Sequence, residues 1–163
     1  MKHRNIITFA ALALSSLVAI TVLAQNAHFM RCSSSVNSST GCISASFRIA
    51  GLGAGASDII TAHTTATATW GCLNHGQQCP NAANKFTASQ ELSGSLTVRA
   101  GHNGSATGSI NLCPAQPTTF SCPGGQTLVL ISVTYSDVTL SNDQNDDTCI
   151  TSGGTFSQYP QCP

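Results

Sequence analysis

The segment from Asp58 to Cys72, DIITAHTTATATWGC, alternates between two kinds of residue along its whole length. The even positions are mainly Ile and Ala and include Trp70, the only tryptophan of the chain, whereas the odd positions are mainly Thr. A period of two with β-branched residues is typical of a strand with one face on a core and the other toward water. The segment therefore predicts a long strand, with Trp70 as the largest single part of the core.

Similar alternation recurs on both sides of this segment, and Gly- and Pro-rich connections separate the alternating stretches. No stretch has the period of a helix. About six to eight short strands joined by such turns predict an antiparallel, immunoglobulin-like β-sandwich, with a small closed β-barrel as the alternative. Within it we expect a hairpin turn at 101–104 (GHNG). At Ser136-Asp137, where the apolar positions change parity, we expect a bulge, with a very tight turn as the alternative.

Residues 1–24 have the features of a secretory signal peptide. Three basic or weakly basic residues precede an apolar run, and small residues stand just before Gln25. A membrane anchor is the alternative, because the apolar run is just long enough to span a bilayer. After the signal peptide we expect an irregular, Ser-rich arm over residues 25–41 and a single β-sandwich domain over residues 42–163.

Eight cysteines follow the predicted signal peptide. An even number in an exported chain predicts four disulfides and an extracellular protein, whereas zinc would require closer pairs than any present. Spacing alone does not fix the pairing. We expect one disulfide to join the end of the Trp70 strand to the start of the most apolar strand of the mature chain. Pairing of cysteines that are neighbours in the sequence is the alternative. The expected pairs are Cys72–Cys122, Cys79–Cys113, Cys32–Cys42 and Cys149–Cys162.

The composition excludes several classes of partner and of chemistry. Charged residues make up 7% of the chain and form no basic cluster, so we expect no nucleic-acid partner and, after signal cleavage, no membrane contact. No Ser lies in a nucleophile motif, and Glu91 is the only glutamate. We therefore expect a protein that is not an enzyme and has no cofactor.

The best candidate for ligand binding is the loop over residues 71–85. Cysteines 72 and 79 would restrict its shape, and loops on a rigid scaffold frequently carry recognition. Its amide and imidazole side chains could hydrogen-bond a glycan or an extracellular protein. These side chains belong to Asn74, His75, Gln77 and Gln78.

A second candidate site is the acidic loop near the C-terminus. Asp143, Asn145 and Asp147 match the opening of a calcium loop, D-x-N-x-D. Thr148 and Gly154 stand where an EF-hand requires Gly and Glu, so an EF-hand is excluded. We expect a solvated acidic turn here, and a looser calcium site at one end of the sandwich is the alternative, since oxygen ligands cluster in this loop.

Two sequons are present, at Asn37 and Asn103. Each is a glycosylation acceptor if the host is a eukaryote. The GHNG segment that contains Asn103 is expected to be accessible to the modifying enzyme because it forms a turn.

Two alternatives come from other classes of function. If processing ended after Ala27, His28 would become the mature N-terminus, and its amine and imidazole nitrogens suit copper in a copper-dependent enzyme or copper carrier. Separately, Thr-rich edge strands with few charges could pair between copies, which would make the chain a self-assembling surface or matrix component and a homo-oligomer.

Three blocks of the chain resemble a family of small, uncharacterised secreted microbial proteins rich in β-structure. The blocks are FRIAGLG, ATATWGCLNHGQQCPNAANK and FSCPGGQTLVLISVTYSDVTL, and the resemblance covers Ser44 to Leu140. It implies that Cys72 and Cys122 form the framework disulfide and that the remaining cysteines are additions. It implies no activity, so we expect a secreted, non-catalytic binding or structural module outside the cell or at its surface.

Overall fold

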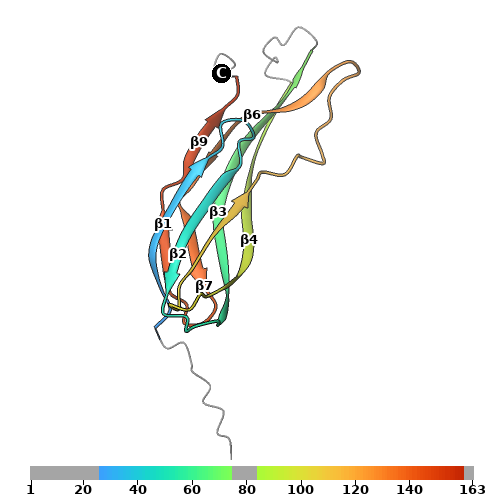
Figure 1. Cartoon of the computed structure of the whole chain (residues 1–163). Coiled ribbons are helices and arrows are strands. Elements are labelled where there is room, and N and C mark those ends of the chain that lie inside the picture. Colours follow the sequence, from blue (N-terminus) through green and yellow to red (C-terminus); the bar gives the residue numbers. More distant parts are fainter. Residues whose placement is uncertain (1–25, 75–83, 160–163) are drawn as a thin grey trace, which may run out of the picture.

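The computed structural model describes residues 26–74 and 84–159, which form two antiparallel β-sheets packed face to face (Figure 1). The described residues contain nine strands. They are β1 (His28–Val36), β2 (Ile43–Ala50), β3 (Ser57–Leu73), β4 (Lys85–Arg99), β5 (Ala106–Leu112), β6 (Thr127–Tyr135), β7 (Val138–Asn142), β8 (Thr148–Thr151) and β9 (Gly154–Ser157). The sheets are open at their edges, so the predicted β-sandwich is confirmed and the closed barrel is wrong.

The strand β3 is the centre of the larger sheet. It pairs with β4 along one edge, and with β7 and then β6 along the other. Its even positions from Ile60 to Trp70 are buried and its odd positions are exposed or half-buried, as the alternation predicts. Trp70 is 6% exposed and belongs to the core, which confirms the expectation for this residue.

The predicted bulge at Ser136-Asp137 is confirmed by the register of the larger sheet. Tyr135 pairs with Ala66 and Thr139 pairs with His63, so three residues of one strand lie opposite two residues of β3. The extra residue reverses the parity of the inward-facing positions. For this reason β6 and β7 continue along one edge of β3 although their buried residues are odd-numbered and even-numbered respectively.

The smaller sheet has the order β1-β2-β5, and its first strand corrects the sequence analysis. The expected irregular arm over residues 25–41 contains β1, which pairs with β2, so the sandwich begins before residue 42. The sequence does not reveal this alternation, because the register shifts at Met30 and the inward-facing Ser34 is polar. Ser34 bonds the hydroxyl of Thr151 on β8 at 3.3 Å, and also the carbonyl oxygen of Ser152.

The turn at 101–104 is present, but the strands that it joins do not form the expected hairpin. The amide of Gly104 donates to the oxygen of Gly101 at 3.0 Å. However, β4 pairs with β3 in the larger sheet and β5 pairs with β2 in the smaller sheet. The chain therefore crosses between sheets here, and both Val98 and Ala106 still point into the common core.

Three disulfides lie within the described residues, and they correct most of the expected pairing. Cys72–Cys122 is confirmed. The expected pairs Cys32–Cys42, Cys79–Cys113 and Cys149–Cys162 are wrong, and so is pairing of sequential neighbours, because the structure has Cys32–Cys149 and Cys42–Cys113. Cys79 and Cys162 lie outside the described residues.

The three bonds fix different parts of the fold. Cys32–Cys149 joins β1 of the smaller sheet to β8 of the larger one, and Cys42–Cys113 closes one end of the β2–β5 ladder. Cys72–Cys122 holds the segment between β5 and β6 against β3, where the rings of Phe86 and Phe120 also stack at 5.6 Å. In Figure 1 this segment lies beside the ends of β3 and β4 that extend past the smaller sheet.

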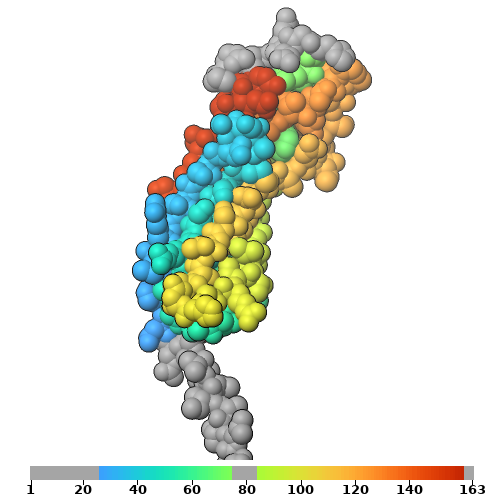
Figure 2. Space-filling view, viewed as in Figure 1, coloured from blue at the N-terminus to red at the C-terminus, as the bar shows by residue number. Residues whose placement is uncertain are grey.

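The molecule is elongated along the strands, and Figure 2 views it from the side of the smaller sheet, with β1, β2 and β5 along the front. Among the described residues there is no helix with the length and apolar character needed to cross a membrane.

Candidate functional site

The outer surface of the larger sheet carries mainly Ser and Thr side chains, with Ile59 and Ile150 also exposed on it, and we call it the hydroxyl face. Every strand of that sheet contributes to it, because its residues are the outward-facing members of the alternation. The hydroxyl face consists of Thr61, Thr65, Thr67 and Thr69 of β3, Thr87, Ser89, Ser93, Ser95 and Thr97 of β4, Ser132 and Thr134 of β6, Thr139 and Ser141 of β7, Thr148 of β8, and Thr155 and Ser157 of β9.

The register of the sheet aligns these residues in rows across the strands. Neighbouring strands lie about 4.8 Å apart, and outward-facing residues recur about every 6.7 Å along a strand, so the hydroxyl groups form a two-dimensional array. Three rows consist only of Ser and Thr. They are Ser157-Ser132-Thr69-Thr87, Thr155-Thr134-Thr67-Ser89 and Thr148-Ser141-Thr61-Ser95.

Hydrogen bonds between side chains order the part of this array that lies on β3 and β4. The hydroxyls of Thr67 and Ser89 are 2.9 Å apart, and those of Thr69 and Thr87 are also 2.9 Å apart. Thr65 donates to Glu91 at 2.8 Å. Each hydroxyl has one proton and two lone pairs, so these bonds leave further capacity toward solvent or a ligand.

Few charges interrupt the hydroxyl face. Between Thr61 and Thr69 on β3 and their partners on β4, the only titratable side chains are His63 and Glu91. Lys85 and Arg99 lie at the two ends of β4, outside this stretch. The face is therefore suited to a neutral ligand with many hydroxyl groups.

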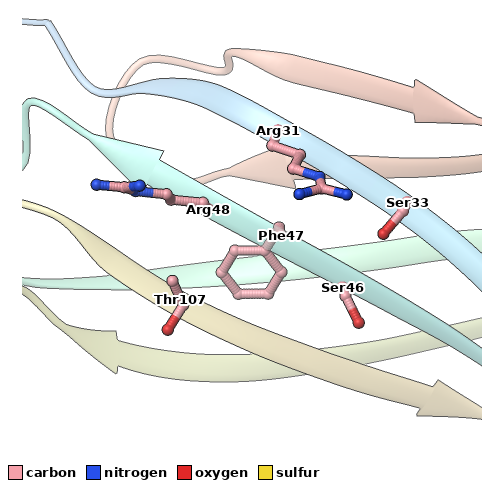
Figure 3. A pocket seen from close by; sticks show the side chains of 6 residues that line it. All are labelled: Arg31, Ser33, Ser46, Phe47, Arg48 and Thr107. Carbon is pink, nitrogen blue, oxygen red and sulfur yellow. The ribbon is translucent and has the colours of Figure 1, made fainter.

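The smaller sheet carries a shallow pocket of about 300 Å³ on its outer surface. Arg31 of β1 and Arg48 of β2 are cross-strand partners, and both are exposed. In Figure 3 their guanidinium groups point in different directions, that of Arg31 lying nearer Ser33. Like charges directly opposite each other in a sheet are unfavourable, and this divergence reduces their repulsion. The pocket is lined by Arg31, Ser33, Ser46, Phe47, Arg48 and Thr107.

The pocket has the chemistry of a binding surface. Its lining offers two cations and three hydroxyls, which suit an anion, and no carboxylate or imidazole that could act as a base. The buried Phe47 beneath it packs edge-to-face against Phe29, with ring centroids 6.1 Å apart. The larger and more regular of the two surfaces is nevertheless the hydroxyl face.

The predicted calcium residues do not point to one centre. Asp147 accepts a hydrogen bond from the amide of Phe29 at 2.8 Å, and the amide group of Asn145 donates to the oxygen of Ala27 at 2.8 Å. Both side chains thus hold the start of β1. Asp143 instead contacts the start of β3, where its amide donates to the oxygen of Ile59 at 3.2 Å, and it lines a depression there with Asp58.

The other predicted site residues are only partly within the described chain. Asn74 is exposed just after β3, whereas His75, Gln77 and Gln78 lie outside the described residues. At the two sequons, the side-chain oxygens of Asn37 and Asn103 accept backbone hydrogen bonds from Ser39 and Ser105 respectively, so both asparagines are exposed residues of ordered turns.

The histidines of the described residues are far apart in the fold. His28 begins β1 and its Nδ1 is 2.8 Å from the oxygen of Asn26, His63 lies on the hydroxyl face, and His102 lies in the turn after β4. Among residues 26–74 and 84–159, no three His, Cys, Asp or Glu side chains form a group that could hold a metal ion.

Comparison with known protein families, with curated proteins and with solved structures found no match to this chain. The resemblance to a family of small secreted microbial proteins therefore stays a prediction.

Sequence reasoning missed two features of these surfaces. The opposition of Arg31 and Arg48 depends on the register shift at Met30, which no local pattern indicates. The second feature is the burial of Asp58. The sequence does indicate it, because Asp58 is a charged residue at an even position of a segment whose other even positions are mainly apolar.

Proposed function

We propose that this protein is a secreted, non-catalytic module that binds neutral glycans through the hydroxyl face. The observation that carries the proposal is the array of Ser and Thr in register across the larger sheet. Sugar hydroxyls donate and accept hydrogen bonds, and so do these side chains. A rigid array loses little conformational freedom on binding, because its side chains are already ordered by cross-strand bonds.

Secretion is supported by three disulfides, which persist in oxidising compartments, and by the features of residues 1–24. The mature chain starts at Gln25 in this proposal. Ala27 is 1% exposed and its carbonyl oxygen accepts a hydrogen bond from Asn145, so residues just before His28 belong to the folded domain. Cleavage after Ala27, which the copper alternative requires, would remove these contacts. N-terminal sequencing of the secreted protein distinguishes the two.

The binding test uses depletion of the protein from solution by insoluble cellulose and by chitin. The variant carries Thr67→Val and Thr134→Val, which lie side by side in one row and lose their hydroxyls while keeping a β-branched shape. The matched control is Thr107→Val, the same change on the outer surface of the smaller sheet.

We expect the wild type and Thr107→Val to bind equally and the double variant to lose most of its binding. Failure of the wild type to bind either polysaccharide, or equal binding by all three proteins, would refute the proposal. Self-assembly is the competing explanation for a flat face with few charges, and it predicts a particle size that rises with protein concentration in the absence of glycan.

A further inference from the structure

The two sheets of the sandwich carry opposite kinds of charge. Arg31 of β1 and Arg48 of β2 are exposed on the outer surface of the smaller sheet, and the strands β1, β2 and β5 contain no Asp or Glu. All six acidic residues of the chain lie on strands of the larger sheet or in the loops that follow them, although the formal net charge of the chain is zero. They are Asp58, Glu91, Asp137, Asp143, Asp146 and Asp147.

No carboxylate of the protein neutralises the two arginines. Within residues 26–74 and 84–159, neither guanidinium has an ion-pair partner. Asp147 is the one acidic side chain that hydrogen-bonds this sheet within the described chain, and it accepts from the amide of Phe29 at 2.8 Å. Backbone N–H groups lie in the plane of a sheet, so Asp147 approaches the edge of β1 and leaves the outer surface positive.

Hydroxyl groups lie beside these charges. The register places Ser33, Ser46 and Ser109 in one row across the three strands, next to the row that contains the arginines. Ser46 donates to Ser109 at 3.2 Å, and each hydroxyl keeps further capacity to donate or accept. In Figure 3 the guanidinium of Arg31 lies nearer Ser33 than that of Arg48 does. The surface therefore combines cations with groups that can bond the hydroxyls of a sugar.

The backbone that presents the arginines is held firmly. Arg31 precedes Cys32, which is bonded to Cys149 of the larger sheet. Arg48 follows the buried Phe47, whose ring packs edge-to-face against Phe29. The two guanidinium groups point apart (Figure 3), so they are placed for two separate anionic groups rather than for one shared anion. Such a ligand carries charges at intervals along a chain.

We propose that the outer surface of the smaller sheet binds a polyuronate, a polysaccharide that carries carboxylates. Arg31 and Arg48 each pair with a uronate carboxylate, whose planar shape matches a guanidinium, and Ser33 and Ser46 bond sugar hydroxyls. Nucleic acid fits less well, because two cations neutralise few phosphates and both Phe residues of β1 and β2 point into the core instead of offering a ring to a base. The hydroxyl face lies on the other sheet, so this proposal is independent of neutral-glycan binding.

The test measures binding of the purified mature protein to immobilised polygalacturonate by biolayer interferometry, in a low-salt buffer with a chelator. Fully methyl-esterified polygalacturonate is the comparison polymer, because it has the same sugar without the charge, and duplex DNA is the comparison polyanion. The variants are Arg31→Gln and Arg48→Gln, both at exposed positions. The matched control is Arg99→Gln, which removes the same charge from β4 of the larger sheet.

We expect the wild type and Arg99→Gln to bind polygalacturonate with similar affinity, and each site variant to lose about three- to tenfold. Binding should weaken in about 1 M NaCl, because exposed charges are then screened within about 3 Å. The proposal is overturned if the wild type does not bind polygalacturonate, or binds the methyl ester equally well. An equal loss in Arg99→Gln would also overturn it, since it would indicate attraction to net charge alone, and so would tighter binding to DNA. None of these arginines lies on the part of the sheet tested with cellulose and chitin, so neither result decides the other.

Discussion

The hydroxyl of Tyr135 donates a hydrogen bond to the carbonyl oxygen of Gly41 at 2.6 Å. Tyr135 belongs to β6 of the larger sheet, and Gly41 lies just before β2 of the smaller one, so the bond joins the two sheets inside the core. Gly41 has a φ of +73°, and a Cβ there would lie 2.8 Å from Leu130. Glycine at this position thus allows the backbone to approach the side chains of Leu130 and Phe156 closely.

Replacement of Tyr135 by Phe is expected to lower the free energy of unfolding by about 1 to 3 kcal/mol, because the buried oxygen of Gly41 loses its donor. Urea unfolding followed by tryptophan fluorescence measures the change. Tyr159→Phe is the control, since Tyr159 is outside the strands. Equal stability of Tyr135→Phe and the wild type would mean that the bond contributes nothing.

Tyr135 should also lose its phenolic proton at a higher pH than an ordinary tyrosine. Burial raises its pKa to about 12, from the ordinary tyrosine value of 10.0. Because the folded state favours the neutral phenol, this group's contribution to stability is complete below pH 10.0 and is lost as the pH rises through about 12. Absorbance titration of a Tyr159→Phe variant, whose only tyrosine is Tyr135, measures this ionisation directly. A transition near the ordinary tyrosine pKa while the fold is intact would contradict the buried bond.

The disulfide pairing can be tested by mapping peptides from a non-reduced digest. We expect linked peptides for Cys32–Cys149, Cys42–Cys113 and Cys72–Cys122. Intact mass should rise by about 8 Da on reduction if all eight cysteines are oxidised. Replacing both Cys32 and Cys149 by Ser is expected to cost about 5 kcal/mol, because that bond closes the longest loop among the three described disulfides, with a sequence separation of 117. A linked Cys32–Cys42 peptide would refute this pairing.

Gly153 faces the backbone of the bulge and should not tolerate a side chain. A Cβ at this position would lie 2.1 Å from the oxygen of Tyr135 and 2.2 Å from that of Ser136. Gly153→Ala is therefore expected to destabilise the protein by about 3 kcal/mol or more, since backbone atoms must move. A Cβ at Gly124 would have no atom within 4 Å, so Gly124→Ala is the control, and thermal unfolding compares the two. Similar unfolding temperatures for both variants would contradict the close contact at the bulge.

The alternation of β3 and the parity change at Ser136-Asp137 were sufficient to predict the central strand, its buried face and the bulge. These features are local, because a strand exposes alternate residues to its two sides whichever strand it pairs with. The same alternation predicted the residues of the hydroxyl face on β3, but not that the other strands of the sheet continue the array in register.

The tertiary structure decided which strands share a sheet and which distant residues meet. Alternation is identical for a strand in either sheet, so it could not show that the chain crosses between sheets at 101–104. The alternation also could not predict that Cys32 bonds Cys149, or that Asp58 and Asp143 line one depression. Those contacts depend on sheet edges and loop paths, which the packing of the whole sandwich sets. Sequence thus determined the faces of the strands, and only long-range packing determined their neighbours.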